Sequence, residues 1–159
     1  MAFNLCELQK LRDLHMGLDS LVENLQTTHR DLGGSLECVF LFLQEHIEVS
    51  ALFVETQDEN LNHRTFCYGH CETGIKKQAP QLHKVSEVIS FALGQNRWFA
   101  QPIEMAGTIT GSIAIAFPND SAPEQKMGEA MLDCVSELLD NFFYSIHSSS
   151  LKHSLIMGL

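Results

Sequence analysis

The feature that most restricts the fold is a leucine repeat near the N-terminus, in the segment from about Asn4 to Leu32. Leucines recur there at alternating steps of three and four, as in a coiled-coil seam, and the pattern is interrupted only at Thr28: Leu11, Leu14, Leu18, Leu21, Leu25 and Leu32. Asn4 and Glu7 have the spacing of an N-cap and its partner at the third helical position. A helix of about 28 residues is roughly 42 Å long, which exceeds what one small domain needs to cover its own core. We therefore predict that this stripe is shared with a second copy; the alternative is that it packs wholly against its own domain.

A second helix and two strands are expected after the leucine repeat. Gly33-Gly34 should break the first helix and Ser35 should cap the next one. The apolar face of that helix comprises Leu36, Val39, Phe40, Leu43 and Ile47. β-branched and aromatic residues then predict strands over 49–56 and 62–69. We expect a loop over 72–81 and a helix over 82–93 that ends at Gly94.

The next two strands, 97–104 and 108–117, flank a short turn and predict a hairpin. The second of them alternates large and small side chains, so its two faces differ in bulk. The large face comprises Ile109, Ile113, Ile115 and Phe117, and the small face comprises Thr108, Thr110, Ser112, Ala114 and Ala116. Small residues allow close approach, and we expect a long helix to lie against them. Ser121 and Glu124 have the spacing of a capping box for this helix, whose apolar pattern should continue to the end of the chain.

This order of helices and strands predicts an α+β domain with an antiparallel sheet. The segment Gln101-Pro102-Ile103 and the glycine-punctuated run from Gly107 to Phe117 resemble the closing hairpin of GAF domains. The resemblance covers roughly residues 32–143. It implies a GAF-like sheet of about five to six strands with the long N- and C-terminal helices packed on one face. It also implies a small-molecule pocket on the other face and parallel dimers built through the terminal helices.

The resemblance leads to a division of the chain into three parts. Residues 1–32 are expected to be a dimerisation and signalling helix, 33–143 a sensory domain, and 144–159 a helix that leads to an output domain. The last helix has no persuasive terminal cap, so we expect a cyclic-dinucleotide enzyme, a nucleotidyl cyclase or a kinase to follow Leu159. We assign the homodimer interface to apolar positions of both terminal helices: Leu11, Leu14, Leu18, Leu21, Leu25, Phe142 and Ile146.

Strand aromatics and one amide are the candidate ligand-binding residues: Phe53, Phe66, Tyr68, Trp98 and Gln101. The connection at 94–97 is shorter than in the GAF pattern, which favours a small or occluded pocket over one for a bilin or a haem. The asparagine-lysine, phenylalanine and aspartate-glutamate signature of cyclic-nucleotide-binding GAF domains has no counterpart here. Neither does the cysteine pattern of GAF-type methionine sulfoxide reductases. The sequence therefore identifies no particular ligand or cofactor.

One cluster combines side chains that can bind zinc, within nine residues: His63, Cys67, His70 and Cys71. On a strand, positions 63, 67 and 71 share one face and position 70 lies on the other, so a common site would require a turn at Gly69. We interpret these as ordinary strand-end residues and predict no metal. A metal site and a redox-active pair of Cys67 and Cys71 remain the alternatives.

Composition limits the classes of partner. The chain has 10 basic and 20 acidic side chains and a formal net charge of −10, which disfavours binding to nucleic acids and anionic lipid surfaces. No apolar stretch approaches the roughly 20 residues that span a bilayer, and the N-terminus has no signal-peptide pattern. Five cysteines without an export signal favour reduced thiols in the cytoplasm.

Catalytic motifs are missing from the sequence: there is no Gly-x-Ser-x-Gly elbow, phosphate-binding glycine loop or His-Glu-x-x-His pair. The sequence thus predicts a cytoplasmic, non-enzymatic sensory domain that binds a small ligand and signals through dimeric helices. A ligand-free dimerisation module is the main alternative. A thiol-dependent enzyme that uses Cys67 or Cys71 is a further one.

Overall fold

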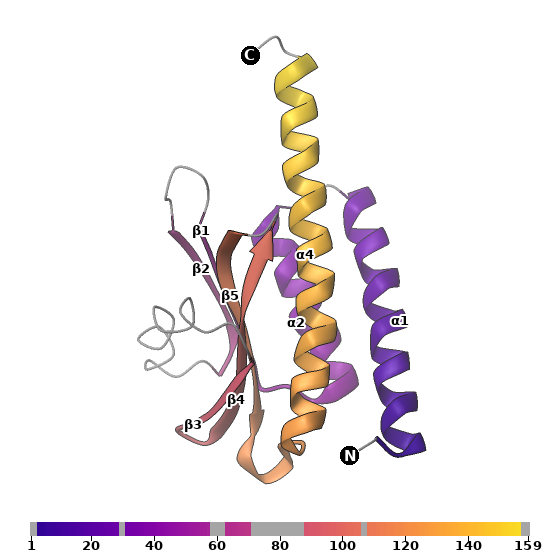
Figure 1. Cartoon of the computed structure of the whole chain (residues 1–159), viewed down its shortest axis with the longest axis vertical. Helices are drawn as coiled ribbons and strands as arrows, with labels where there is room; N and C mark the ends of the chain where they lie inside the picture. The colour runs from indigo at the N-terminus through magenta and orange to yellow at the C-terminus, as the bar shows by residue number, and fades with distance from the viewer. Residues whose placement is uncertain (1–2, 29–30, 58–62, 71–87, 106–107, 157–159) are drawn as a thin grey trace.

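The computed structural model describes residues 3–28, 31–57, 63–70, 88–105 and 108–156. In chain order, the elements are α1 (Leu5–Thr28), α2 (Leu32–Ile47), β1 (Ala51–Gln57), β2 (His63–Gly69), β3 (Ile89–Leu93), β4 (Asn96–Met105), β5 (Thr108–Pro118), the 3₁₀-helix η1 (Asn119–Ser121) and α4 (Gln125–Ile156). The described strands form one antiparallel sheet in the order β2-β1-β5-β4-β3, and the described α-helices lie on one side of it (Figure 1). The predicted α+β class with a five-stranded sheet is confirmed.

The helices form two layers over the sheet. α4 contacts β4 and β5, α2 contacts β2, and α1 packs on α4 and α2. α1 and α4 run side by side in the same direction, and α4 extends beyond the end of α1 (Figure 1). Among the described helices, none combines the length and the apolar character that crossing a bilayer requires.

The long helix lies on the large face of β5, contrary to the expectation that it would approach the small face. Ile113, Ile115 and Phe117 belong to the core that the sheet shares with the helices. The close approach comes instead from a small residue on the helix, because a Cβ at Gly128 of α4 would overlap the ring of Phe99 on β4. The small face of β5 therefore lies on the opposite side of the sheet.

The start of α1 agrees with the sequence prediction, and the start of α2 differs from it. Asn4 and Glu7 do exchange backbone-to-side-chain hydrogen bonds of 2.8 and 3.1 Å, so the predicted cap of α1 is confirmed. α2, however, is capped by Asp31, whose Oδ1 accepts a hydrogen bond of 2.7 Å from the Gly34 amide. Gly33-Gly34 therefore lies inside the first turn, and Ser35 is not the cap, because Asp31 already satisfies an amide that would otherwise be left open.

The predicted capping box at Ser121 is also wrong. Ser121 ends the short 3₁₀-helix η1, and α4 begins four residues later at Gln125. The three residues between them are extended or irregular, so Ser121 is too far from the first turn of α4 to cap it.

The predicted helix over 82–93 is wrong where the structure describes it. Ile89–Leu93 is strand β3, paired residue by residue with Asn96–Ala100 of β4; residues 82–87 lie outside the described part. Gly94 and Gln95 form the two-residue turn of this hairpin, and Gly94 has a φ of 61°. The short 94–97 connection is thus a hairpin turn and not a shortened pocket wall.

The leucine stripe of α1 packs inside its own domain. Leu14, Leu18 and Leu25 are 2%, 1% and 6% exposed, and Leu11 and Leu21 are partly buried against the same core. The structure thus follows the alternative interpretation of the stripe, and a role for these five leucines in a dimer stays untested. The side chains of Phe142 and Ile146 lie outside the described part of the structure.

Candidate functional site

The face of the sheet opposite the helices carries a second buried cluster, and we call this face the far face. Its members are fully buried: Ala51, Phe53, Trp98, Ala100, Ala114 and Ala116, each 0% exposed. Three partly buried residues of β3 pack against them: Ile89, Phe91 and Leu93. The central strands of the sheet therefore lie between two apolar clusters.

The register of the strands arranges the far face in rows. Phe53, Ala114 and Ala100 are paired across β1, β5 and β4 in one row. In the next row, Ala51 and Ala116 are paired, and Ala116 is paired with Trp98. The two large rings thus come from strands on either side of β5, and alanines occupy the positions between them. Because both rings are fully buried, the chain itself covers this face.

A third row gives the far face a polar end. Glu55 lies opposite Ser112 on β5, and Ser112 lies opposite Pro102 on β4. Glu55 is 7% exposed and Ser112 is 0% exposed. In the described part of the structure, the Ser112 hydroxyl has no hydrogen-bond partner. A buried polar group of this kind requires an explanation, because burying an unsatisfied hydroxyl destabilises a fold.

The other end of the far face is also polar, but its groups hold the strands together. Asn96 is 6% exposed; its Oδ1 accepts a hydrogen bond of 2.8 Å from the Ser50 hydroxyl, and its Nδ2 donates one of 3.3 Å to the His70 carbonyl. These bonds connect the start of β4 to the residues next to β1 and β2. We assign Asn96 a structural role, since its side chain is used within the fold.

The structure separates the five predicted ligand-binding residues. Phe53 and Trp98 lie on the far face. Phe66 and Tyr68 pack against the core on the helix side, and the register pairs Gln101 with Ile113, which belongs to that same core. Successive residues of a strand alternate between its faces, so these three positions cannot share a site on the far face with Phe53 and Trp98. Ligand binding by any of the five stays a prediction.

Neither Glu55 nor Ser112 is among the candidate residues that the sequence predicts. Glu55 is two residues from Phe53, and Ser112 is two residues from Ala114, so each shares a face with a far-face residue. The same period-two alternation that was applied to β5 would have found them once the small face was known to lie away from the helices.

Tyr68 connects β2 to α2. Its hydroxyl donates a hydrogen bond of 2.7 Å to the Gly33 carbonyl, and its ring stacks on Phe40 with centroids 6.1 Å apart. Burial raises the pKa of Tyr68 above its ordinary value, and the nearby charges of Glu37 and Asp31 raise it further. These contacts explain Tyr68 as a structural residue on the helix side.

Three members of the predicted zinc-type cluster, His63, Cys67 and His70, belong to the described residues. Among the described residues, no three His, Cys, Asp or Glu side chains are grouped to hold a metal ion. Cys67 is exposed opposite Phe53 and forms a disulfide, so the expectation of reduced thiols is wrong for this residue. Cys71 lies outside the described residues.

The thiol of Cys134 on α4 is a poor candidate nucleophile. Burial raises its pKa above the ordinary value, and the charges of Asp133 and Glu137 add to this effect. Because the thiolate is the reactive form, a raised pKa makes this thiol less reactive at neutral pH.

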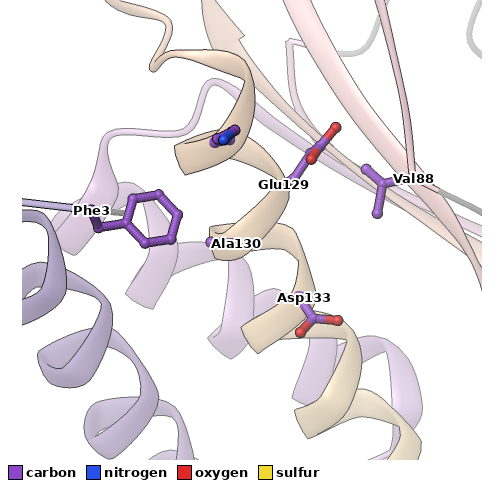
Figure 2. A pocket seen from close by; sticks show the side chains of 6 residues that line it. Phe3, Val88, Glu129, Ala130 and Asp133 are labelled. Carbon is purple, nitrogen blue, oxygen red and sulfur yellow. The ribbon is translucent and has the colours of Figure 1, made fainter. Parts of the chain in front are cut away.

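A separate hollow of about 430 Å³ lies at the base of α4. Its lining is Phe3, Val88, Lys126, Glu129, Ala130 and Asp133. Phe3 and Val88 lie on opposite sides of the first turns of α4, and Glu129 and Asp133 extend from the helix on the side of Val88 (Figure 2). The hollow thus follows the surface of the helix, and we assign no site to it.

The comparisons with known proteins identify the fold. No family model matches the sequence, and neither does any curated protein. The structure resembles the GAF domain of nlh2 from A. Aeolicus, solved in an inactive state, with a TM-score of 0.64 and 14% identity over 87% of this chain and 98% of that one. It also resembles the GAF domain of a phosphoenolpyruvate-protein phosphotransferase from Acinetobacter, with a TM-score of 0.62 and 12% identity over 92% and 97% of the two chains.

A third similar structure is the GAF domain/HD domain protein from Geobacter sulfurreducens, with a TM-score of 0.55 and 12% identity over 84% of this chain and 98% of that one. These similarities cover nearly the whole of each solved chain. The protein therefore has the GAF fold, as the closing hairpin predicted.

Proposed function

We propose that this chain is a regulatory GAF domain, in which the far face receives a small ligand and α4 carries the resulting change to an output domain. The observation that carries the proposal is the position of β4 and β5 between two buried clusters. Trp98 and Phe99 are adjacent in the chain, yet Trp98 belongs to the far face and Phe99 to the core under the helices. A change on one side of these strands must therefore be accommodated on the other.

The contact between β4 and α4 is tight enough to transmit such a change. Phe99 is 0% exposed, and its ring fills the space that a side chain at Gly128 would occupy. The same ring meets Phe117 of β5 edge-on, with centroids 6.0 Å apart. Because close-packed interiors transmit strain, a shift of β4 should displace the first turns of α4.

Two further findings support a signalling role. α4 is a single helix of 32 residues that continues past the end of α1, so movement at its first turns can reach its far end (Figure 1). The solved domains of the same fold include one from a phosphoenolpyruvate-protein phosphotransferase and one from a GAF domain/HD domain protein. An output domain of enzymatic type, as the sequence led us to expect, fits this arrangement.

The far face favours a small and largely apolar ligand. Its fully buried members supply two aromatic rings and four methyl groups, and apolar groups of this kind line most small-molecule sites. The chain already covers this face, so a ligand must displace some of the covering side chains, and a haem or a bilin would have to displace many. We therefore propose a ligand of the size of an amino acid or a small aromatic compound.

The chain offers a direct optical test, because Trp98 is its only tryptophan. A ligand that binds on the far face should shift or quench the tryptophan emission and raise the melting temperature in the same titration. Cyclic mononucleotides, amino acids and small aromatic acids and amines form the screen. A compound that raises the melting temperature without changing the emission binds elsewhere. If no compound in the screen changes either signal, the sensory proposal fails.

The full burial of the far face also favours a second candidate function, a dimerisation module with a permanently filled core. If the chain is such a dimerisation module, the second copy would bind at the end of α4, because the leucines of α1 are buried within their own domain. The double variant Phe142→Glu with Ile146→Glu should then reduce the mass in light scattering from that of a dimer to that of a monomer. Leu8→Glu, at a position that is 50% exposed on α1, is the matched control and should leave the dimer intact. Because the sensor is also expected to signal through dimeric helices, the module is favoured over the sensor only if the dimer forms and no compound in the screen changes the emission or the melting temperature.

A further inference from the structure

The polar end of the far face indicates which chemical class of ligand the site would take. We propose that Glu55 and Ser112 bind the protonated amine of a ligand whose apolar body lies against Phe53 and Trp98. This inference rests on the proposed sensory function, and it adds the charge and the orientation of the ligand.

The strand register places the groups correctly for such a ligand. Glu55 and Ser112 are direct cross-strand partners, so their Cβ atoms are about 4.5–5.5 Å apart and one ammonium group can reach both side chains. The row of Phe53 and Ala114 lies two residues further along the same strands, or about 6.6 Å away. A ligand with two or three bonds between its amine and its apolar group therefore spans both rows.

The two polar side chains supply the acceptors that an amine requires. The Ser112 hydroxyl is fully buried without a partner among the described residues, so a ligand N–H would restore a hydrogen bond that the fold lacks. The Glu55 carboxylate is also buried, and a carboxylate has about four acceptor positions, so it can accept from a ligand in addition to contacts within the chain. An ammonium group carries three donors and no acceptor, which matches this pair.

The charges of the molecule favour a cation over an anion at this position. The formal net charge of −10 attracts cations, and a ligand carboxylate would lie next to Glu55. Two described arginines that could hold an anion are used on the helix side: Arg64 lies over a phenylalanine ring at 5.1 Å, and Arg97 donates to Ser90 at 3.2 Å. The polar end of the far face thus offers an anion no partner among these side chains.

Matched pairs of compounds test the class of ligand. The probes are 2-phenylethylamine, tryptamine and isopentylamine, each compared with the carboxylate that has the same apolar part: 3-phenylpropionate, indole-3-propionate and 4-methylpentanoate. Melting temperature and calorimetric titration are measured for each, with Trp98 emission for the non-indole pairs. At least one amine should bind with an affinity about tenfold or more above that of its matched carboxylate.

Two variants and two controls test the residues. Glu55→Gln keeps the shape of the side chain, and Ser112→Ala removes only the unsatisfied hydroxyl, so both should fold. Glu55→Gln should weaken amine binding by about tenfold or more, and Ser112→Ala by about threefold to tenfold. The controls are Glu45→Gln, an exposed charge on α2, and Ser35→Ala, which removes another buried hydroxyl that lacks a partner among the described residues. Neither control should change amine binding.

The outcomes separate this inference from the proposed function. If the carboxylates bind as well as the amines, or if Glu55→Gln and Ser112→Ala leave amine binding unchanged while a compound still alters Trp98 emission, the inference is wrong and the sensory function stands. If no compound of either charge alters emission or melting temperature, both are wrong.

Discussion

The contact between Gly128 and Phe99 gives the sharpest test of how α4 is coupled to the sheet. A Cβ at Gly128 would overlap the ring of Phe99, which is 0% exposed and has no free space into which to move. Gly17 on α1 is a matched control, because a Cβ there would overlap the ring of Phe42, which is only partly buried and can rotate towards solvent. Both positions are helical, so both substitutions gain about 1 kcal/mol of helix propensity.

The expected difference follows from these two environments. Overpacking a filled core lowers the free energy of unfolding by about 1–3 kcal/mol, so Gly128→Ala should leave the protein less stable by up to about 2 kcal/mol. Gly17→Ala should be neutral or stabilising by up to about 1 kcal/mol. Urea denaturation measures both values. Phe99→Leu removes the ring and should reduce the effect of Gly128→Ala by about 1 kcal/mol in a double-mutant cycle. If Gly128→Ala and Gly17→Ala are equally stable, or the cycle shows no coupling, the tight contact does not exist.

Three further predictions concern the helix side of the sheet. Asp31→Ala should lower the free energy of unfolding by about 1 kcal/mol because α2 loses its cap. Ser35→Ala should lower it by less. If urea denaturation shows Ser35→Ala to be the more destabilising of the two, Ser35 is the cap after all. Leu18→Glu places a charge at a position that is 1% exposed and should destabilise the monomer by more than about 3 kcal/mol; a variant with unchanged unfolding but altered mass would contradict this. The raised pKa of Tyr68 means that its neutral form stabilises the fold below about pH 10 and that this stabilisation is lost as the pH rises through the folded pKa. Thermal unfolding between pH 8 and 11 should therefore depend less on pH in Tyr68→Phe, and equal slopes would refute the assignment.

Much of the fold could be predicted from local patterns. The alternation of large and small residues from 108 to 117 predicted strand β5 correctly, and the spacing of Asn4 and Glu7 predicted the cap of α1. The hairpin of β4 and β5, together with its glycines, carried the resemblance to GAF domains that the solved structures confirm. These features depend on residues that are close in the sequence.

The errors arise where the structure is decided by distant parts of the chain. In the sequence, Ile89 and Leu93 continue the helical spacing that begins at Leu82 and Val85. Pairing with β4 nevertheless makes Ile89–Leu93 a strand. Both faces of β5 are buried, so the presence of Ala114 and Ala116 on one of them does not reveal which face the helix covers.

The candidate site was predicted in part for the same reason. Of the residues predicted to bind a ligand, Phe53 and Trp98 lie in one cluster on the far face, whereas Phe66 and Tyr68 lie on the opposite face. The register of β1 with β2 pairs Phe53 with Cys67, and a shift of one residue would have exchanged the faces. The sequence of a single strand contains no information on this register.

Amide hydrogen exchange of an Ala114→Leu variant tests most directly whether the far face is coupled to α4. This substitution adds bulk inside the buried cluster of the far face. Thr65→Leu adds bulk at an exposed position of the edge strand β2, outside that buried cluster, and is the control. α2 serves as a reference within the chain, because its main contact with the sheet is with the edge strand β2. Coupling predicts faster exchange in residues 125–140 of α4 in Ala114→Leu, with little change in α2 and none in the Thr65→Leu control. Exchange that changes only in the strands, or equally in α2 and α4, would contradict transmission from the far face to α4.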